Sequence, residues 1–200
     1  MKLFTVGYEG TDIQDFTTSL IKQGVRSVAD VRKNPVSRKR GFSKRLLAGA
    51  LAEVGIEYLH LPGLGVPTEW RKLAKTEIIT RKKMFSDYVK KILPKQTEDI
   101  ELLRKLMKKK GLALLCYEAD AHDCHRSFVV DAMVKSQKEK IKIVNLEVQQ
   151  PRLFNIGVRD VDTNRSKKTR EPSDARKKAG SSSRRTPKRS PGRRTEASAS

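Results

Sequence analysis

Segments with the period of a β-strand alternate with segments with the period of an α-helix through the first 150 residues. A chain of this kind buries its apolar surface by pairing the strands in one sheet and covering the sheet with the intervening helices. Repeated units of a strand followed by a helix imply mostly parallel strands, joined by right-handed crossovers. We therefore predict an α/β fold: a mostly parallel, doubly wound (Rossmann-like) sheet of about five strands with helices on both faces. The expected strands are residues 3–8, 27–31, 56–61, 112–117 and 141–148.

The helices between these strands have recognisable starts. Thr11, with Gln14 three residues later, forms a capping-box pattern and predicts the start of the first helix. Ser43 is the expected N-cap of the second helix. Two helices are expected between the third and fourth strands, one around residues 84–93 and one beginning near residue 98. The last helix is predicted over residues 124–136.

The last 50 residues differ in composition from the rest. Residues 151–200 hold 15 Lys and Arg against five Asp and Glu, and no large apolar residue occurs after position 162. Such a segment cannot bury enough surface to offset the entropy lost on ordering. We therefore predict an α/β domain over residues 1–150, followed by a linker and a disordered basic tail over residues 151–200. A basic arm is typical of nucleic-acid binding by counterion release, although a purely solubilising tail has the same composition.

The sequence also indicates a compartment. No apolar run is long enough to span a bilayer, and no signal-peptide core is present. Two cysteines without a disulfide-rich spacing are typical of a reducing environment. We therefore expect a cytoplasmic protein whose partner is nucleic acid and not a membrane.

Polar side chains follow each of the first four expected strands. Because the carboxyl ends of parallel strands meet at one edge of a sheet, the loops at residues 7–10, 30–35, 60–65 and 116–118 should come together. We therefore expect one site built from four loops and from the start of the following helix. Its candidate residues are Tyr8, Glu9, Arg32, His60, Cys116, Tyr117, Glu118, Cys124, His125 and Arg126.

The two cysteines have three interpretations. Cys116 and Cys124 could bind a metal together with His125, His122 or His60, because thiolate and imidazole ligands suit zinc or iron. Alternatively, Cys124 could be a nucleophile, since a helix N-terminus and its neighbours His125 and Arg126 favour the thiolate. Cys116 could also simply pack in the sheet, as free cysteines often do.

Two carboxylates and two tyrosines stand at strand ends. Glu9 and Glu118 could face each other as an acid and base pair or as metal ligands. Tyr8 and Tyr117 could stack on a base or ring of a substrate. Ordinary strand-end packing with exposed carboxylates is the alternative for all four residues.

Two arginines and a histidine are the remaining substrate-binding candidates. Arg32 and Arg126 could hold a phosphate or carboxylate, helped by backbone amides at a helix N-terminus. Arg126 could instead brace the loops by pairing with carboxylates. His60 is a candidate because of its place at the expected edge, although a lone strand histidine is more often a hydrogen-bonded structural residue.

Five short patterns occur in a fixed order. They are TVGYEG at residues 5–10, DVR-x-x-P-x-S at 30–37, GFSK at 41–44, Y-x-H-L-P-x-L-G at 58–65, and LLCYE at 114–118 followed by CHR at 124–126. In these patterns the chain resembles the family catalogued as domain of unknown function 488, over roughly residues 3–148. The resemblance implies a small cytoplasmic α/β domain and carries no settled reaction.

Three functions fit the sequence. The first is an enzyme acting on a nucleic acid or phosphate-bearing substrate, with catalysis by Cys124, His125, Glu118 and Glu9. The second is a nucleic-acid-binding module without catalysis. The third is a regulator that responds to a metal or to oxidation through its two cysteines.

Overall fold

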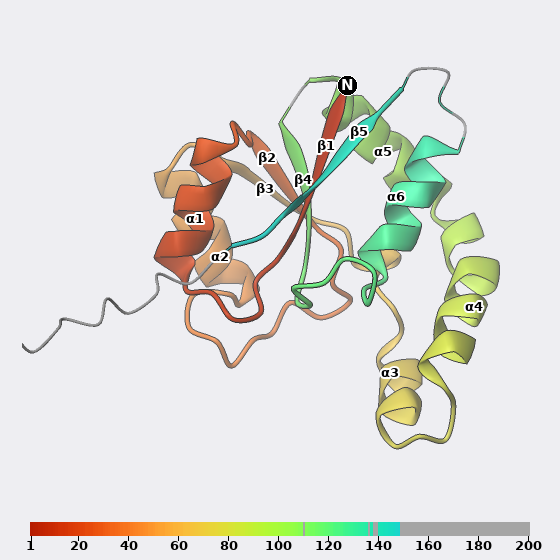
Figure 1. Ribbon diagram of the computed structural model, residues 1–200. Helices are drawn as coiled ribbons and strands as arrows, with labels where there is room; N and C mark the ends of the chain where they lie inside the picture. The colour runs from red at the N-terminus through yellow and green to blue at the C-terminus, as the bar shows by residue number, and fades with distance from the viewer. Residues whose placement is uncertain (110, 136, 138–139, 149–200) are drawn as a thin grey trace, which may run out of the picture. The chain divides into compact units, whose positions relative to one another are not determined.

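The computed structural model describes residues 1–109, 111–135, 137 and 140–148 (Figure 1). The basic tail predicted from the sequence lies outside these residues. The elements in chain order are β1 (Lys2–Gly7), α1 (Ile13–Lys22), β2 (Ser27–Asp30), α2 (Lys44–Glu53), β3 (Glu57–His60), the 3-10 turn η1 (Pro62–Leu64), α3 (Thr68–Lys75), α4 (Arg81–Lys91), the 3-10 turn η2 (Leu93–Lys95), α5 (Thr97–Lys108), β4 (Leu112–Cys116), α6 (Arg126–Val134) and β5 (Lys142–Leu146).

The strands form one five-stranded parallel sheet in the order β3-β2-β4-β1-β5. This arrangement confirms the predicted parallel α/β fold. The register places Gly7 of β1 opposite Cys116 of β4, and Asp30 of β2 opposite His60 of β3. The carboxyl ends of β1, β2, β3 and β4 therefore lie along one edge of the sheet, as expected for parallel strands.

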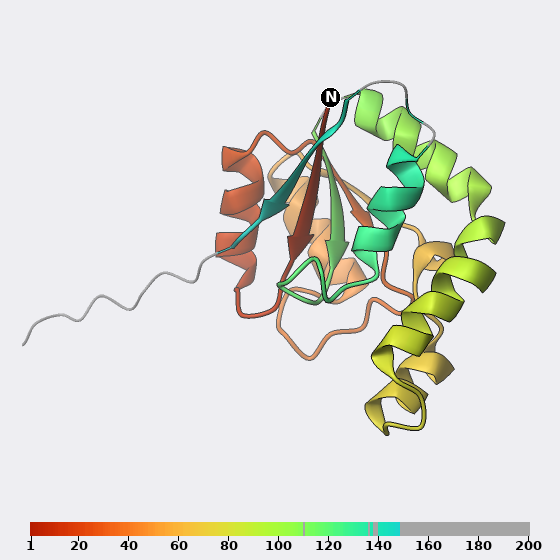
Figure 2. The ribbon, with the colours of Figure 1, turned by 45° about the vertical axis from the view of Figure 1, so that its right-hand side comes forward.

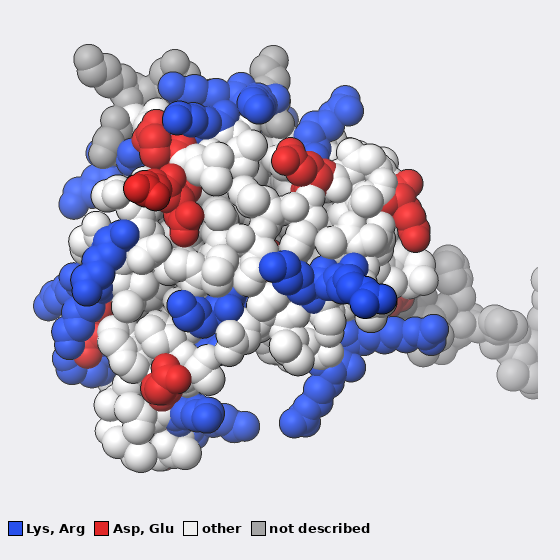
Figure 3. Space-filling model, turned by 180° about the vertical axis from the view of Figure 1, so that it is seen from behind, with Lys and Arg blue, Asp and Glu red and all other residues white. Residues whose placement is uncertain are grey.

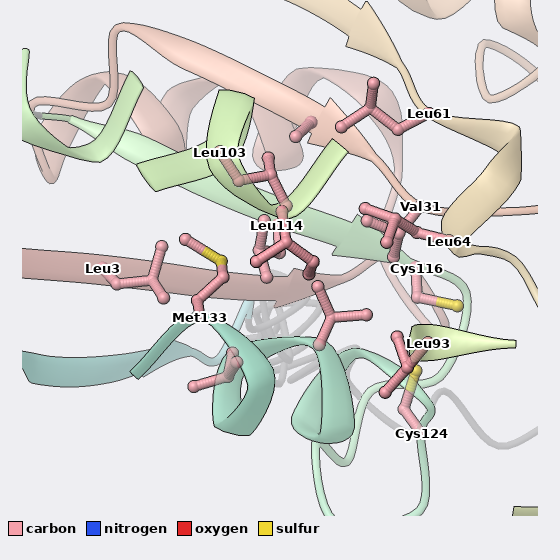
Figure 4. Packing of buried hydrophobic residues seen from close by; sticks show 14 of the residues in the cluster. Leu3, Val31, Leu61, Leu64, Leu93, Leu103, Leu114, Cys116, Cys124 and Met133 are labelled. Atoms are coloured by element: carbon pink, nitrogen blue, oxygen red, sulfur yellow. The ribbon is translucent and has the colours of Figure 1, made fainter. Parts of the chain in front are cut away.

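Helices cover both faces of the sheet, as predicted for a doubly wound fold (Figure 1). The helices α1 and α2 pack on one face through buried apolar side chains such as Phe16 and Leu47. The helices α4, α5 and α6 pack on the other face. There, Leu103 of α5 and Met133 of α6 belong to the same apolar cluster as Leu114 of β4 (Figure 4). Burial of each such side chain contributes roughly 1.5–3 kcal/mol to folding.

The region between β3 and β4 differs from the prediction. The sequence predicted two helices there, whereas the described residues form three α-helices, α3, α4 and α5. No side chain of α3 is fully buried, although Trp70 and Ala74 pack against the apolar core. The helix has only eight residues and no side-chain N-cap, so its sequence gives a weak helix signal. Together with the start of α4 it forms an arm that extends past the strand ends (Figure 2). None of the helices in the described residues is long and apolar enough to cross a membrane.

The first helix begins one residue later than predicted. Its N-cap is Asp12, whose carboxylate accepts a hydrogen bond from the Asp15 backbone N–H at 2.8 Å. The capping box at Thr11 is therefore wrong: this residue is fully buried, and its hydroxyl donates to the Asp12 carbonyl.

Two smaller differences concern later helices. Ser43 is the N-cap of α2 but donates its hydroxyl to the Ser37 carbonyl, and α6 begins at Arg126.

The two possible caps can be distinguished by mutation. Asp12→Ala should lower the free energy of unfolding by about 1 kcal/mol, because it removes the acceptor for the first turn of α1. Thr11→Val keeps the volume of the side chain and should lower the stability less. Urea unfolding of the two variants measures both effects, and a larger loss for Thr11→Val would contradict the assignment of Asp12 as the cap.

Candidate functional site

Four side chains with metal-binding atoms meet at the edge of the sheet. Cys116 ends β4, Glu118 follows it in the loop, and Cys124 and His125 stand immediately before α6. One ligand atom from each residue lies within 4.8 Å of the others. Figure 4 shows the two cysteines at the same end of the apolar cluster beneath α6. The structure therefore brings together Cys116, Cys124 and His125, the predicted metal ligands, and places Glu118 but not Glu9 with them.

The orientation of the His125 ring is fixed by a backbone carbonyl immediately after β2. Its Nε2 lies 2.9 Å from the Val31 carbonyl, and because a carbonyl can only accept, Nε2 carries the hydrogen. In neutral His125, Nδ1 is then unprotonated and lies 3.7 Å from the Cys116 sulfur and 3.8 Å from the Cys124 sulfur. A histidine that donates one ring nitrogen to a backbone carbonyl and offers the other to the site is the usual arrangement of a metal ligand.

Burial shapes the electrostatics of the cluster. Burial raises the pKa of the Cys124 thiol, and the adjacent Cys116 raises it further. For Glu118, burial acts to raise the pKa, but hydrogen bonds from Cys116 and Cys124 outweigh it and hold the pKa below its usual value. For His125, burial acts to lower the pKa, but the contact with Cys124 leaves it raised. Ionising both thiols beside this carboxylate would bury several negative charges together, which requires a compensating cation.

A cavity of about 500 Å³ opens onto the cluster. Cys116, Glu118 and His125 line it, whereas Cys124 is fully buried behind them. The walls combine cationic, aromatic and small polar side chains from the loops after β1, β2 and β4 and from α3. These wall residues include Lys33, Asn34, Ser37, Arg38, Lys39, Arg71, Tyr8 and Tyr117. A ligand that reaches the cluster through this cavity therefore passes between positively charged side chains.

Arg32 lines the same cavity, but its donors are engaged within the protein. The guanidinium pairs with Asp30 through Nε at 2.8 Å and Nη2 at 2.5 Å, and its Nη1 donates to the Tyr8 hydroxyl and the Phe42 carbonyl. Burial acts to lower the pKa of Arg32, but the Asp30 carboxylate raises it above its ordinary value. The hydroxyl of Tyr58 also donates to Asp30, at 2.7 Å. Arg32 thus ties together the loops after β1 and β2.

Arg126, like Arg32, is buried and uses its donors within the protein. Its side chain is 1% exposed, and it donates to the Glu118 and Ala119 carbonyls and to the Thr5 hydroxyl. This geometry matches the alternative in which Arg126 braces the loops, although its partners are carbonyls and not the carboxylates that the sequence suggested. Arg126 therefore holds the segment that carries Glu118.

The two tyrosines differ in exposure. Tyr8 is buried and stacks on Phe42 with 4.3 Å between ring centroids. Tyr117 is 46% exposed, and its ring meets the edge of Tyr8 at 5.3 Å. Only Tyr117 offers much free ring surface to a ligand in the cavity.

Glu9 and His60 lie at the edge but do not line the cavity. The exposed Glu9 carboxylate accepts a hydrogen bond from the Ala119 backbone N–H at 3.1 Å and is not among the clustered ligands. The Nε2 of His60 donates to the Arg32 carbonyl at 3.0 Å. Both side chains thus hold the loops that surround the site.

Two features near the site were not predicted from the sequence. Arg71 lines the cavity, but it lies on the short helix α3, which was not predicted, and it belongs to no motif. Gly65 lies in the loop after β3, where a Cβ would overlap the backbone of Lys33. The glycine lets the loop after β3 approach the loop after β2, and the pattern G-x-G in that loop was the available signal.

Comparisons with known proteins identify the family of the chain. A family profile described as "Domain of unknown function DUF488" matches residues 12–133, which is more than half of the chain. The matched range includes the four clustered ligand residues and both buried arginines. Neither the curated proteins nor the solved structures gave a match. The chain therefore belongs to the family described as domain of unknown function DUF488.

Proposed function

We propose that this protein is a zinc-dependent enzyme whose metal is bound by Cys116, Cys124 and His125. In tetrahedral zinc sites with Zn–S of about 2.3 Å and Zn–N of about 2.0–2.1 Å, sulfur and nitrogen ligands are about 3.6 Å apart. The two distances from His125 Nδ1 to the sulfurs, 3.7 and 3.8 Å, are close to that separation. This agreement is the observation that carries the proposal.

Glu118 is better suited to move a proton than to complete the metal site. Its Oε2 lies 2.9 Å from the Cys116 sulfur, which is a hydrogen-bond distance and well below the separation of two zinc ligands. Three protein ligands leave the fourth position for water, which is the pattern of catalytic zinc sites. Because Glu118 lines the cavity, it can accept the proton of a water bound on the cavity side.

The reaction class that follows is hydrolysis. Zinc lowers the pKa of a bound water to about 7 and so supplies hydroxide near neutral pH. With zinc held by Cys116, Cys124 and His125, Glu118 would take a proton from the water that attacks the substrate, and would pass it to the leaving group as the bond to that group breaks. The cationic cavity walls favour an anionic substrate that bears phosphate. Thiolate ligands must stay reduced, which agrees with a cytoplasmic location.

Metal analysis and one conservative variant test this proposal. The full chain reconstituted with zinc should retain it stoichiometrically after dialysis, and Cys116→Ser and Cys124→Ser should each lose it. Glu118→Gln should keep the zinc but lower hydrolysis about 10²–10⁴-fold, because it removes only the proton acceptor. The assay panel runs from phosphomonoesters and nucleotides to oligonucleotides.

Each part of the proposal can fail separately. Wild-type protein that does not retain zinc would contradict the metal site. Zinc-loaded protein that hydrolyses no member of the panel, or a Glu118→Gln variant with wild-type rates, would contradict the catalytic role and favour a structural metal in a binding module.

A further inference from the structure

A second cavity reaches the same cluster from another direction. It has a volume of about 250 Å³ and extends between α3 and α4, where Lys75, Arg81 and Phe85 line it. The two cavities share Val66, Arg71, Glu118 and His125. The two cavities therefore adjoin at the cluster, and we call them together the edge groove. One end lies over the loops after β1 and β2, and the other lies along the arm of α3 and α4.

Cations line the edge groove at both ends. Lys33, Arg38 and Lys39 stand at the loop end, Arg71 at the middle, and Lys75 and Arg81 at the arm end. All of these side chains except the half-buried Lys39 are exposed. Figure 3 shows Lys and Arg side chains both on the arm and across the notch beside it.

Little within the protein neutralises these cations. Among the described residues that line the two cavities, Glu118 is the one carboxylate. The ion pairs found in the described part of the chain involve none of the six groove cations. Arg81 donates to the Asp123 carbonyl, which positions its guanidinium without removing its charge. The groove therefore offers a row of positive charge that passes over the cluster.

Each end of the groove also has an aromatic ring. Tyr117 is 46% exposed at the loop end. Phe85 is half-buried at the arm end, with the Arg81 guanidinium 5.6 Å from its ring centroid. Proteins that bind single-stranded nucleic acids combine aromatic rings with a cationic groove. The bases stack on the rings, and the phosphates lie along the positive charges.

We propose that the edge groove binds single-stranded nucleic acid, which crosses the cluster and occupies both cavities. A mononucleotide would fill the larger cavity alone and leave the charges of the arm unused. A duplex hides its base faces within its own stack and has none to offer to Tyr117 or Phe85. Single-stranded nucleic acid would then be the substrate class of the proposed zinc enzyme, and its hydrolysis rests on that proposed function. Binding in the groove does not depend on catalysis.

The test measures binding of labelled oligothymidylates to the full chain by fluorescence anisotropy. All proteins carry Glu118→Gln, which should slow turnover enough for affinity to be measured. Arg38→Gln neutralises the loop end, Lys75→Gln the arm end, and Lys22→Gln on the exposed side of α1 is the matched control. An oligonucleotide of about eight residues falls within the site sizes of about 4–16 nucleotides found for single-strand binders.

Each groove variant should weaken binding of the octamer several-fold. Each should also reduce the slope of log K against log salt by about 0.7, the contribution of one phosphate in a single strand. Lys22→Gln should change neither quantity by a comparable amount. Tyr117→Ala should weaken binding about tenfold through loss of stacking. A dinucleotide should respond to one end of the groove only.

Two results would overturn the inference. If octamer binding responded to Arg38→Gln but not to Lys75→Gln, the ligand would be confined to one cavity, as for a mononucleotide. If both variants behaved like Lys22→Gln, binding would take place elsewhere on the chain. Because the readout is affinity, these failures are distinct from a failure of zinc binding or of hydrolysis.

Discussion

Asp30→Asn is expected to lower the free energy of unfolding by about 3–5 kcal/mol, because it leaves the buried Arg32 guanidinium without its counter-charge. Asp30 is fully buried and accepts hydrogen bonds from the Arg32 side chain and from the Tyr58 hydroxyl. An asparagine would turn an N–H group toward one of these donors. Urea or thermal unfolding, followed by circular dichroism, measures the loss.

A surface carboxylate provides the control. Asp87 on α4 pairs with Lys83 and Lys91, whose side chains are 60% and 61% exposed. Asp87→Asn should therefore change the stability only slightly. Arg32→Gln combined with Asp30→Asn removes the unpaired charge, so the double variant should lose less than the sum of the single losses. Strict additivity of the two single losses would show that Asp30 and Arg32 are not energetically coupled.

Gly7→Ala is expected to have the second large effect. A Cβ on Gly7 would overlap the Glu118 carbonyl oxygen and lie 2.9 Å from the Cα of Ala119. These are backbone atoms, and Arg126 and Glu9 hold the segment in place. Overpacking typically costs about 1–3 kcal/mol, and here the loss should lie at or above the top of that range because no side chain can move aside.

A second glycine tests whether the effect comes from close packing. Gly49 lies on the exposed side of α2, and a Cβ there would meet no atom within 4 Å. Gly49→Ala should raise the free energy of unfolding by roughly 0.5–1 kcal/mol, since alanine loses less backbone entropy in a helix. Chemical denaturation of both variants gives the comparison, and a stable Gly7→Ala protein would mean that the loop carrying Glu118 moves freely.

The architecture was largely predictable because it follows from local patterns. Apolar runs such as Leu112–Cys116 predict strands, and amphipathic segments between them predict helices. The alternation of the two predicts parallel pairing, which the structure confirms. The α3 helix was missed because it has only eight residues and no side-chain N-cap, so its few apolar residues give a weak helix signal. The cap of α1 was misplaced because Thr11 and Asp12 are both good N-caps, and only the packing of the buried Thr11 decides between them.

The site was predictable in place but not in detail. Topology alone brings Cys116 and Glu118 to the edge where Cys124 and His125 immediately precede the next helix. The tautomer of His125 depends on the Val31 carbonyl, 94 residues away in the chain, and no local pattern encodes that contact. The same is true of Arg32. Its Nη1 donates to the Tyr8 hydroxyl and the Phe42 carbonyl, which belong to other loops, and no local pattern predicts these hydrogen bonds.

The hydrogen bond from His125 to Val31 has a consequence for how this site could arise or be transferred. The short segment that holds all four clustered ligands, residues 116–125, lacks Val31, whose carbonyl orients the imidazole. A peptide copied from this segment would keep the ligands but lose their geometry, so grafting it onto another scaffold would not reproduce the site.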